Sequence, residues 1–228
     1  MELNIITWLW GDKYKPHDVY RLATQVHKHL KLPHTFTAFS DREHKQLPNA
    51  RLIKDRDLCD RACFCRLRMF DPDWQRENGF IDWIVSLDLD LVITGSLDGV
   101  FLPRADFMIL KGVNAVNPNP FNASVMMLRA GTNSEVWSEF SRDAASKIEQ
   151  HEFPDDQGWI WHMLPDASGW QAGKEGIYGF QKPGWPNEKV GFALPDDARI
   201  VSFIGKRKPQ MYTQLAWVKK HWVEATRQ

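Results

Sequence analysis

The sequence predicts an α/β protein with a mainly parallel, doubly wound sheet. Apolar strand-like segments alternate with segments whose apolar residues recur at helical spacing, as in consecutive β-α units. The run 84–93 is rich in Ile, Val and Leu, which is typical of a strand covered on both faces. With 228 residues, the chain has a length that fits a single domain over residues 1–228.

The first part of the chain is predicted to form a β-α-β unit. Residues 3–9 are an apolar strand, and Pro16 begins a helix whose apolar residues recur every three or four positions. Pro33 prevents this helix from continuing. Residues 34–39 alternate like a second strand, and 51–54 form a third.

The middle of the chain continues the alternation. Residues 60–70 are predicted to form a helix that Pro72 ends, and 82–87 form the strand that leads to two acids. Residues 107–111 and 124–128 have the apolar character of further strands.

The last third contains longer predicted helices and an irregular segment. An amphipathic helix is predicted over 134–148 and a shorter one over 156–163. The Gly-, Trp- and Pro-rich segment 169–195 is predicted to be irregular or a small hairpin. Residues 200–203 form a last strand, and 212–226 form a closing helix.

Composition restricts the partners. Lys plus Arg and Asp plus Glu number 29 each, so the net charge does not indicate a nucleic-acid or membrane partner. No apolar stretch approaches the roughly 20 residues that cross a bilayer. The odd number of cysteines, Cys59, Cys63 and Cys65, and the lack of a secretory signal predict a reduced, cytoplasmic location. Their spacing does not match a zinc site.

Two acids interrupt the apolar run 84–93. Asp88 and Asp90 are one residue apart, so an extended chain places both side chains on one face. A buried carboxylate needs a compensating cation or donor, and Mn²⁺ or Mg²⁺ would provide one while leaving positions for phosphate. Ligands of open α/β sheets bind at the carboxyl ends of strands, where these acids fall. The alternative is a strand end whose acids face solvent or cap a helix.

Several blocks occur in a defined order between about residues 60 and 210. They are Cys65-Arg66-Leu67-Arg68, Leu87-Asp88-Leu89-Asp90, Phe121-Asn122-Ala123-Ser124-Val125-Met126, Asp156-Gln157 and Phe203-Ile204-Gly205-Lys206-Arg207-Lys208-Pro209. With these blocks the chain resembles the GT-A fold glycosyltransferases, closest to family 8, the glycogenin and lipopolysaccharide galactosyltransferase group. The resemblance implies a Rossmann-like fold and transfer of a sugar from a nucleotide-sugar donor, most often a UDP-sugar, with retention of configuration.

The resemblance assigns the charged residues to the donor diphosphate. Asp88 and Asp90 would hold Mn²⁺ (or Mg²⁺), which stabilises the leaving diphosphate as a Lewis acid. Gly205 and Lys208 match the ends of the family's Gly-x-x-Lys loop, and Lys208 would add a permanent positive charge. A solvated basic loop is the alternative. Arg66 would reach the donor with its fixed set of hydrogen-bond donors.

Two further blocks correspond to the donor sugar. Asn122 and Ala123 match the donor-sugar contact of the family. Gln157 and Asp156 match a pair beside the anomeric centre, where an amide or carboxylate would steady an oxocarbenium-like transition state.

Helix capping is the alternative for the residues around Asp156. In the first loop, Asp12 and Tyr14 match the family's contacts to the nucleotide base. Asp12 would accept a hydrogen bond from the base, and the Tyr14 ring would stack on it. A surface turn is the alternative.

Three positions depart from the family pattern. Ser202 stands where a histidine is the usual third metal ligand, Ser124 replaces a glycine, and Gln210 replaces a tryptophan. A serine hydroxyl is a poorer ligand than imidazole for Mn²⁺. We therefore expect weaker metal binding without donor, or dependence on Lys208 and Arg207 for part of the charge.

The acceptor stays open at this stage. Lys206–Lys208 and the residues around Trp217 and Trp222 form a basic, aromatic patch that suits an anionic surface or a phosphate backbone. A glycan, a glycolipid or a modified nucleic-acid base is therefore considered as acceptor. Two other classes are a nucleotide-sugar or glycan-binding module without turnover and, third, a nucleotidyltransferase using two-metal chemistry.

Overall fold

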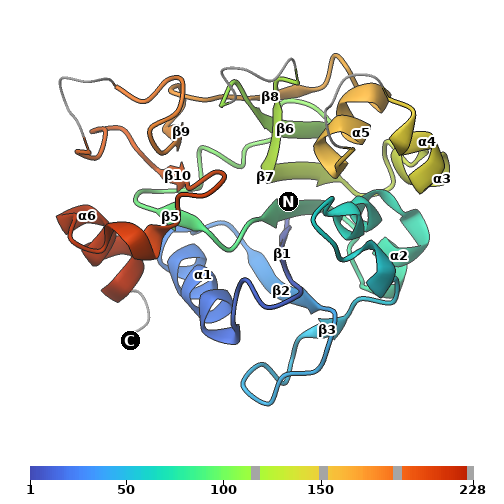
Figure 1. The fold of residues 1–228 in the computed structure, drawn as a ribbon, viewed down its shortest axis with the longest axis horizontal. Coiled ribbons are helices and arrows are strands. Elements are labelled where there is room, and N and C mark those ends of the chain that lie inside the picture. The colour runs from blue at the N-terminus through green and yellow to red at the C-terminus, as the bar shows by residue number, and fades with distance from the viewer. Residues whose placement is uncertain (114–118, 149–153, 187–191, 225–228) are drawn as a thin grey trace.

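The computed structural model describes residues 1–113, 119–148, 154–186 and 192–224 and shows an α/β fold (Figure 1). A seven-stranded sheet has the order β3-β2-β1-β4-β7-β6-β8, and a three-stranded sheet has the order β5-β10-β9. The strands are β1 (Leu3–Leu9), β2 (His34–Ser40), β3 (Arg51–Leu52), β4 (Trp83–Leu87), β5 (Leu91–Ile93), β6 (Phe107–Lys111), β7 (Phe121–Arg129), β8 (Ser168–Gln171), β9 (Ile177–Gly179) and β10 (Ile200–Ser202).

The helices are short apart from the first. The α-helices are α1 (Pro16–His29), α2 (Pro72–Glu77), α3 (Glu135–Ser138), α4 (Arg142–Ser146), α5 (Asp156–Met163) and α6 (Ala216–Val218). Short segments of 3₁₀ or π helix occur at Arg56–Leu58, Phe64–Phe70, Pro209–Tyr212 and Lys219–Val223. None of the helices in the described ranges has the length and apolarity to cross a membrane.

The seven-stranded sheet is mainly parallel, as predicted. Strand β7 runs antiparallel to β4 and to β6, whereas all other pairings in this sheet are parallel. Alternate residues enter different cores: Ile5 and Val85 pack with α1, and Ile6 and Ile84 pack with the side chains around α5. Helices therefore cover both faces (Figure 1).

The apolar run 84–93 is not one strand. Strand β4 ends at Leu87, the chain turns at residues 88–90, and β5 pairs antiparallel with β10 in the second sheet. Two non-local backbone hydrogen bonds hold the turn. The Asp88 amide donates to the Ser124 carbonyl oxygen (3.0 Å), and the Phe203 amide donates to the Asp90 carbonyl oxygen (3.4 Å). The two acids thus lie at the junction between the sheets.

Two helix predictions were wrong in detail. The helix expected over 60–70 is a 3₁₀ helix over Phe64–Phe70, and Pro72 begins α2 instead of ending a helix. Asp71 caps α2 by accepting from the Asp73 amide (2.9 Å), and proline suits the first helical position because its missing N–H is not needed there.

The helix expected over 134–148 is divided into α3 and α4. Ser141 has an extended backbone and caps α4 by accepting from the Ala144 amide (3.0 Å), so a single helix cannot run through it.

The segment 169–195 contains two strands, against the prediction of an irregular segment or a local hairpin. Strand β8 pairs with β6 and β9 pairs with β10, so the two do not pair with each other. Trp170 of β8 is buried, and its indole N–H donates to the Val100 carbonyl oxygen (3.0 Å). Residues 187–191 of this segment lie outside the described ranges.

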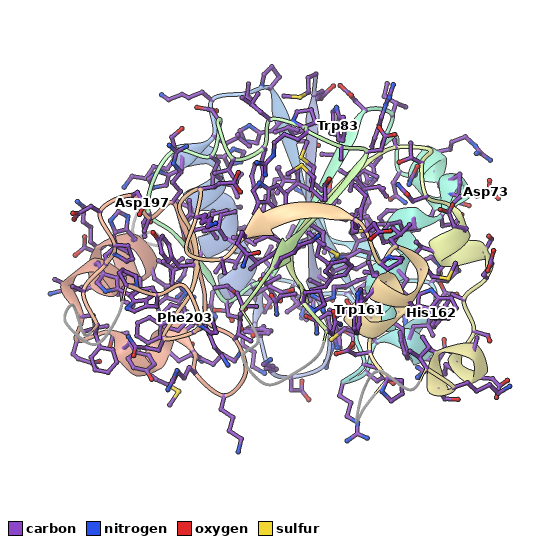
Figure 2. All side chains as sticks on the ribbon, turned by 90° about the horizontal axis from the view of Figure 1, so that it is seen from above. Asp73, Trp83, Trp161, His162, Asp197 and Phe203 are labelled. Atoms are coloured by element: carbon purple, nitrogen blue, oxygen red, sulfur yellow. The ribbon has the colours of Figure 1, made fainter. Side chains whose placement is uncertain are left out.

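The closing segment is not one helix over 212–226. It consists of a 3₁₀ turn at Pro209–Tyr212, α6 and a π turn at Lys219–Val223, and residues 225–226 lie outside the described ranges. Val218 and Trp222 pack here with Phe203 at the end of the second sheet. Figure 2 labels Phe203. This core cluster holds the loop after β10 and the closing segment against the three-stranded sheet.

Candidate functional site

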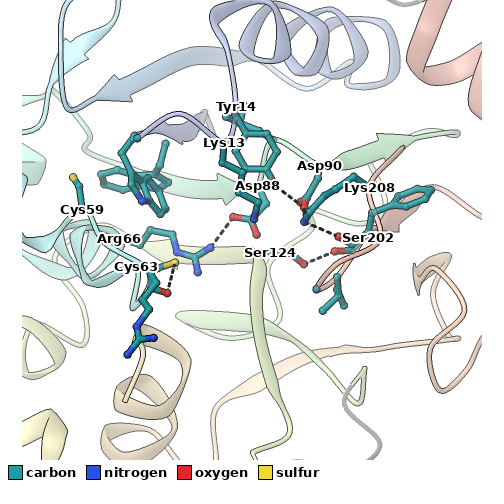
Figure 3. Close-up of a pocket in the computed structure, with 18 of the residues that line it drawn as sticks. Lys13, Tyr14, Cys59, Cys63, Arg66, Asp88, Asp90, Ser124, Ser202 and Lys208 are labelled. Carbon is teal, nitrogen blue, oxygen red and sulfur yellow. Dashed lines mark hydrogen bonds and ion pairs between the residues drawn. The ribbon is translucent and has the colours of Figure 1, made fainter. Parts of the chain in front are cut away.

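A cavity of about 540 Å³ opens where β1, β4 and β10 end (Figure 3). The sequence predictions converge on it. Its lining contains the predicted residues Asp12, Tyr14, Arg66, Asp88, Asp90, Asn122, Gln157, Gly205 and Lys208. Two other predicted residues, Ala123 and Asp156, are buried (1% and 0% exposed) and are not part of the lining.

Asp88 is paired with a buried arginine. The Arg66 guanidinium donates to Asp88 Oδ1 (2.6 Å) and to the Ala123 carbonyl oxygen (3.2 Å). Its Nε lies 2.7 Å from Asp156 Oδ2, although the two groups are not aligned as a hydrogen bond. Burial opposes the charge on Arg66, but Asp156 and Asp88 outweigh it and raise the pKa. Arg66 thus connects the turn at Asp88 to α5.

Asp90 has its own cation. Lys208, in the loop after β10, forms an ion pair with Asp90 Oδ2 and donates to the Phe203 carbonyl oxygen (3.3 Å). The Tyr14 hydroxyl donates to the same carboxylate oxygen (2.7 Å). Burial and the Asp90 charge raise the pKa of Tyr14, so the phenol stays a neutral donor. Each acid of the Asp-x-Asp pair is therefore compensated by a side chain from another part of the fold.

Asn122 and Gln157 are held by neighbouring amides. Asn122 Oδ1 accepts from the Ser124 amide (3.2 Å), and Gln157 Oε1 accepts from the Ala123 amide (3.1 Å). Gln157 also donates to Asp155 Oδ2 (3.0 Å), and Asp155 caps α5. An amide oxygen has two lone pairs, so Gln157 keeps acceptor capacity toward the cavity.

The two serines that depart from the family pattern are partners. Ser202 Oγ donates to Ser124 Oγ (3.0 Å); both side chains are buried at the cavity wall, and they lie 78 positions apart in the chain. Neither replacement is therefore an isolated change. No sequence pattern predicts this contact, because β10 and β7 belong to different sheets.

The donor set fits a hard divalent cation with few protein ligands. Asp88 and Asp90 present carboxylates to one cavity, and Mg²⁺ commonly binds one or two carboxylates together with waters and substrate phosphates. Across the described residues, no three His, Cys, Asp or Glu side chains come together as a metal cluster. Any cation here would thus depend on ligand oxygens.

Arg207 and Asp12 lie differently from what the sequence indicated. Arg207 donates to the Gln181 carbonyl oxygen (3.2 Å) and is not part of the cavity lining, so it does not supplement Lys208. The Asp12 side chain is 84% exposed and lies 3.3 Å from Arg42.

Sequence reasoning missed Lys13 as a cavity residue. Its position between Asp12 and Tyr14 was the available signal. Partial burial and the Lys208 cation lower the pKa of Lys13.

The buried carboxyl of Asp156 makes the stability depend on pH. Burial raises its pKa to about 7, although Arg66 opposes the shift. Because this pKa lies above that of the unfolded chain, the stabilising contribution is present below about pH 4 and is lost as the pH rises through about 7.

The neutral Asp156→Asn variant isolates this contribution. We expect the free energy of unfolding of the wild type, relative to this variant, to fall by up to about 1.4 kcal/mol per pH unit between about pH 4 and 7. Urea denaturation of both proteins across this range measures it; a difference that is constant or grows with pH contradicts the prediction.

The fold is that of solved GT-A type glycosyltransferases. Neither a family model nor a curated protein sequence matches the chain. A galactosyltransferase LgtC in complex with donor and acceptor sugar analogues matches with a TM-score of 0.60 and 13% identity, over 98% of this chain and 95% of the other. An active-site mutant of LgtC, with glutamate in place of glutamine, matches with a TM-score of 0.61 and 13% identity, over 97% and 94%.

A second solved glycosyltransferase has the same fold over part of its length. GlyE of Streptococcus pneumoniae TIGR4 matches with a TM-score of 0.63 and 18% identity, over 97% of this chain. The match covers 59% of the GlyE chain, so this chain spans less than two thirds of it. These likenesses confirm the predicted fold class.

Proposed function

We propose that this chain is a glycosyltransferase that moves a sugar from a nucleotide-sugar donor, a UDP-sugar, to an acceptor with retention of configuration. The observation that carries the proposal is the meeting of Asp88, Asp90 and Lys208 with Asn122 and Gln157 around one cavity. Acids for a cation, a lysine for phosphate and amides for a sugar are what such a donor requires. The fold shared with known glycosyltransferases supports the same reaction.

Asp88 and Asp90 are proposed to hold Mn²⁺ or Mg²⁺. When bound, the cation supplies Lewis-acid stabilisation of the diphosphate that leaves the anomeric carbon. Lys208 places a permanent charge beside the same leaving group, and its loop is fixed by the bond to the Phe203 carbonyl oxygen. Preorganised charge of this kind acts strongly because it needs no rearrangement during the reaction.

Arg66 and Asp156 are proposed to act behind the cavity wall. The Arg66 side chain is 6% exposed, and its guanidinium contacts Asp88, Ala123 and Asp156. We therefore assign Arg66 to positioning Asp88. The part of Arg66 that lines the cavity would contact the nucleotide-sugar donor. Asp156 is 0% exposed, so it holds Arg66 and does not face the anomeric carbon.

Asn122 and Gln157 are proposed to contact the donor sugar. The Asn122 oxygen is used by the Ser124 amide, so its NH₂ group is available to a sugar hydroxyl. In the reaction the bond from the anomeric carbon to the phosphate oxygen breaks and the diphosphate keeps the electron pair. The acceptor hydroxyl oxygen forms the new bond to the anomeric carbon, and its proton passes to the leaving diphosphate. The remaining lone pair of Gln157 Oε1 would steady the positive charge on the sugar.

The base and the acceptor are assigned by position. Tyr14 and the exposed Asp12, with Trp10 in the same lining, form the end of the cavity proposed for the base. LgtC was solved with an acceptor sugar analogue, which supports a glycan or glycolipid acceptor over a nucleic-acid base for this chain.

A binding module without turnover is the second candidate. The observation that favours it is the Ser124–Ser202 hydrogen bond, which places a pair of bonded hydroxyls at the cavity wall where a third metal ligand would be needed. Such a module would bind a nucleotide sugar tightly and leave it intact.

A donor screen distinguishes the two candidates. Nucleotide sugars are tested by thermal shift with and without Mn²⁺, and the stabilising ones are assayed for release of free sugar and nucleoside diphosphate. We expect one UDP-sugar at 100 times its dissociation constant to stabilise the fold by about 2.7 kcal/mol and to be hydrolysed slowly. Stabilisation without hydrolysis or transfer to any glycan acceptor supports the module. Release of diphosphate from a nucleoside triphosphate supports a nucleotidyltransferase.

A further inference from the structure

Two lysines from distant parts of the chain meet at one wall of the cavity. Lys13 lies in the loop between β1 and α1, and Lys208 lies in the loop after β10 (Figure 3). Their ammonium nitrogens are 4.9 Å and 5.9 Å from the centroid of the same ring, that of Tyr14, and the Lys208 charge lowers the pKa of Lys13. Like charges placed together in this way repel unless an anion joins them.

The two lysines differ in their partners. Lys208 is paired with Asp90, and Arg66 is paired with Asp88, so each acid of the turn already has one cation. In the described part of the chain, no carboxylate lies within ion-pair distance of the Lys13 ammonium group. Lys13 is therefore a cation of the cavity lining that is not neutralised by an ion pair within the described residues.

We propose that Lys13 and Lys208 form a lysine clamp that binds the donor diphosphate, and that the clamp binds it with or without a divalent cation. The identity of the ligand rests on the proposed function. A diphosphate has enough oxygens to accept charge-assisted hydrogen bonds from both ammonium groups and removes their repulsion. Arg66 and Lys208 offset the two carboxylates that would otherwise repel it.

The ligand set around Asp88 and Asp90 indicates why a lysine clamp would be needed to balance the diphosphate charge. Ser202 occupies the position of the usual third metal ligand and is bonded to Ser124 at the cavity wall, and hydroxyls bind Mn²⁺ less well than imidazole. Protein cations then carry a larger share of the diphosphate charge. Lys13 lies in a loop and is not part of a core cluster, so its replacement leaves the core intact.

Calorimetric titration with inorganic pyrophosphate tests the clamp, because this probe has neither base nor sugar. The whole chain is titrated in EDTA and in Mn²⁺, with UDP in parallel. We expect the wild type to bind pyrophosphate in both buffers and Lys13→Gln to bind about tenfold more weakly in both, the effect of one charge-assisted hydrogen bond. Lys13→Arg should retain most of the affinity. Lys45→Gln, which removes an exposed charge outside the cavity lining, should bind like the wild type.

The results separate the clamp from the enzyme assignment. Pyrophosphate binding that requires Mn²⁺, no pyrophosphate binding at all, or equal affinity of Lys13→Gln and Lys45→Gln overturns the clamp. If one of these results is obtained and the protein still releases sugar from its donor, the clamp is overturned and the glycosyltransferase assignment is retained. If Lys13 is needed for pyrophosphate binding but no sugar is released, the clamp stands and the enzyme assignment fails.

Discussion

Replacing Asp90 with asparagine is expected to lower turnover of the donor by about 10²–10³-fold, because the variant loses a charged metal ligand and an electrostatic stabiliser of the leaving diphosphate. Asp90 is 6% exposed and accepts from Tyr14 and Lys208, and an amide oxygen can still accept one of these bonds. The fold should therefore survive. Initial rates of sugar release, measured over a Mn²⁺ titration, check the prediction, and saturation should require more Mn²⁺.

The matched control removes an acid far from the cavity. Asp143 is 76% exposed and pairs with Lys147 on α4, so Asp143→Asn should keep the wild-type rate. The unfolding transition of Asp90→Asn, followed by circular dichroism, shows whether a low rate reflects lost structure. A folded Asp90→Asn protein with wild-type turnover and unchanged Mn²⁺ dependence would remove the assignment of Asp90 as a metal ligand.

Replacing Arg66 with methionine is expected to lower the free energy of unfolding by about 3–5 kcal/mol, the usual cost of removing one partner from a buried ion pair. The variant leaves Asp156, which is 0% exposed, without its cation. Because burial already raises the pKa of Asp156 to about 7, the variant can protonate this group at low pH. The loss should thus be smaller at about pH 5 than at pH 8. Urea denaturation at both pH values measures the effect.

Two further variants test the cause of that loss. Arg129→Met removes an exposed arginine 3.5 Å from Asp106 and should cost less than about 1 kcal/mol. The double variant Arg66→Met/Asp156→Asn removes the buried charge together with its partner, so part of the stability should return. A loss that is independent of pH and is not reduced in the double variant would show that packing, and not the ion pair, is responsible.

Local patterns predicted most strands of the seven-stranded sheet, and most of the predicted site residues line the cavity. The apolar runs predicted β1, β2, β4, β6 and β10, and helical spacing predicted α1 and α5, because a strand or helix buried on a known face needs a fixed periodicity. The position of Asp88 and Asp90 after β4 also followed from the sequence, since ligands of such sheets lie at the carboxyl ends of strands. The missed strand β8 shows the limit: its single buried tryptophan, Trp170, stands among glycines and polar residues, and only pairing with β6 makes it a strand.

The sequence by itself therefore determined the α/β class, the order of the main elements and the residue types that meet in the cavity. Only the tertiary structure decided that the run 84–93 turns between two sheets, that Ser202 bonds to Ser124, and that Lys13 joins Lys208. The physical reason is that these contacts join segments far apart in the chain, where neither periodicity nor spacing carries information. They depend on how the loop after β10 is held at the turn after β4, by the bond from the Phe203 amide to the Asp90 carbonyl oxygen and by the core that Phe203 shares with Val92 of β5.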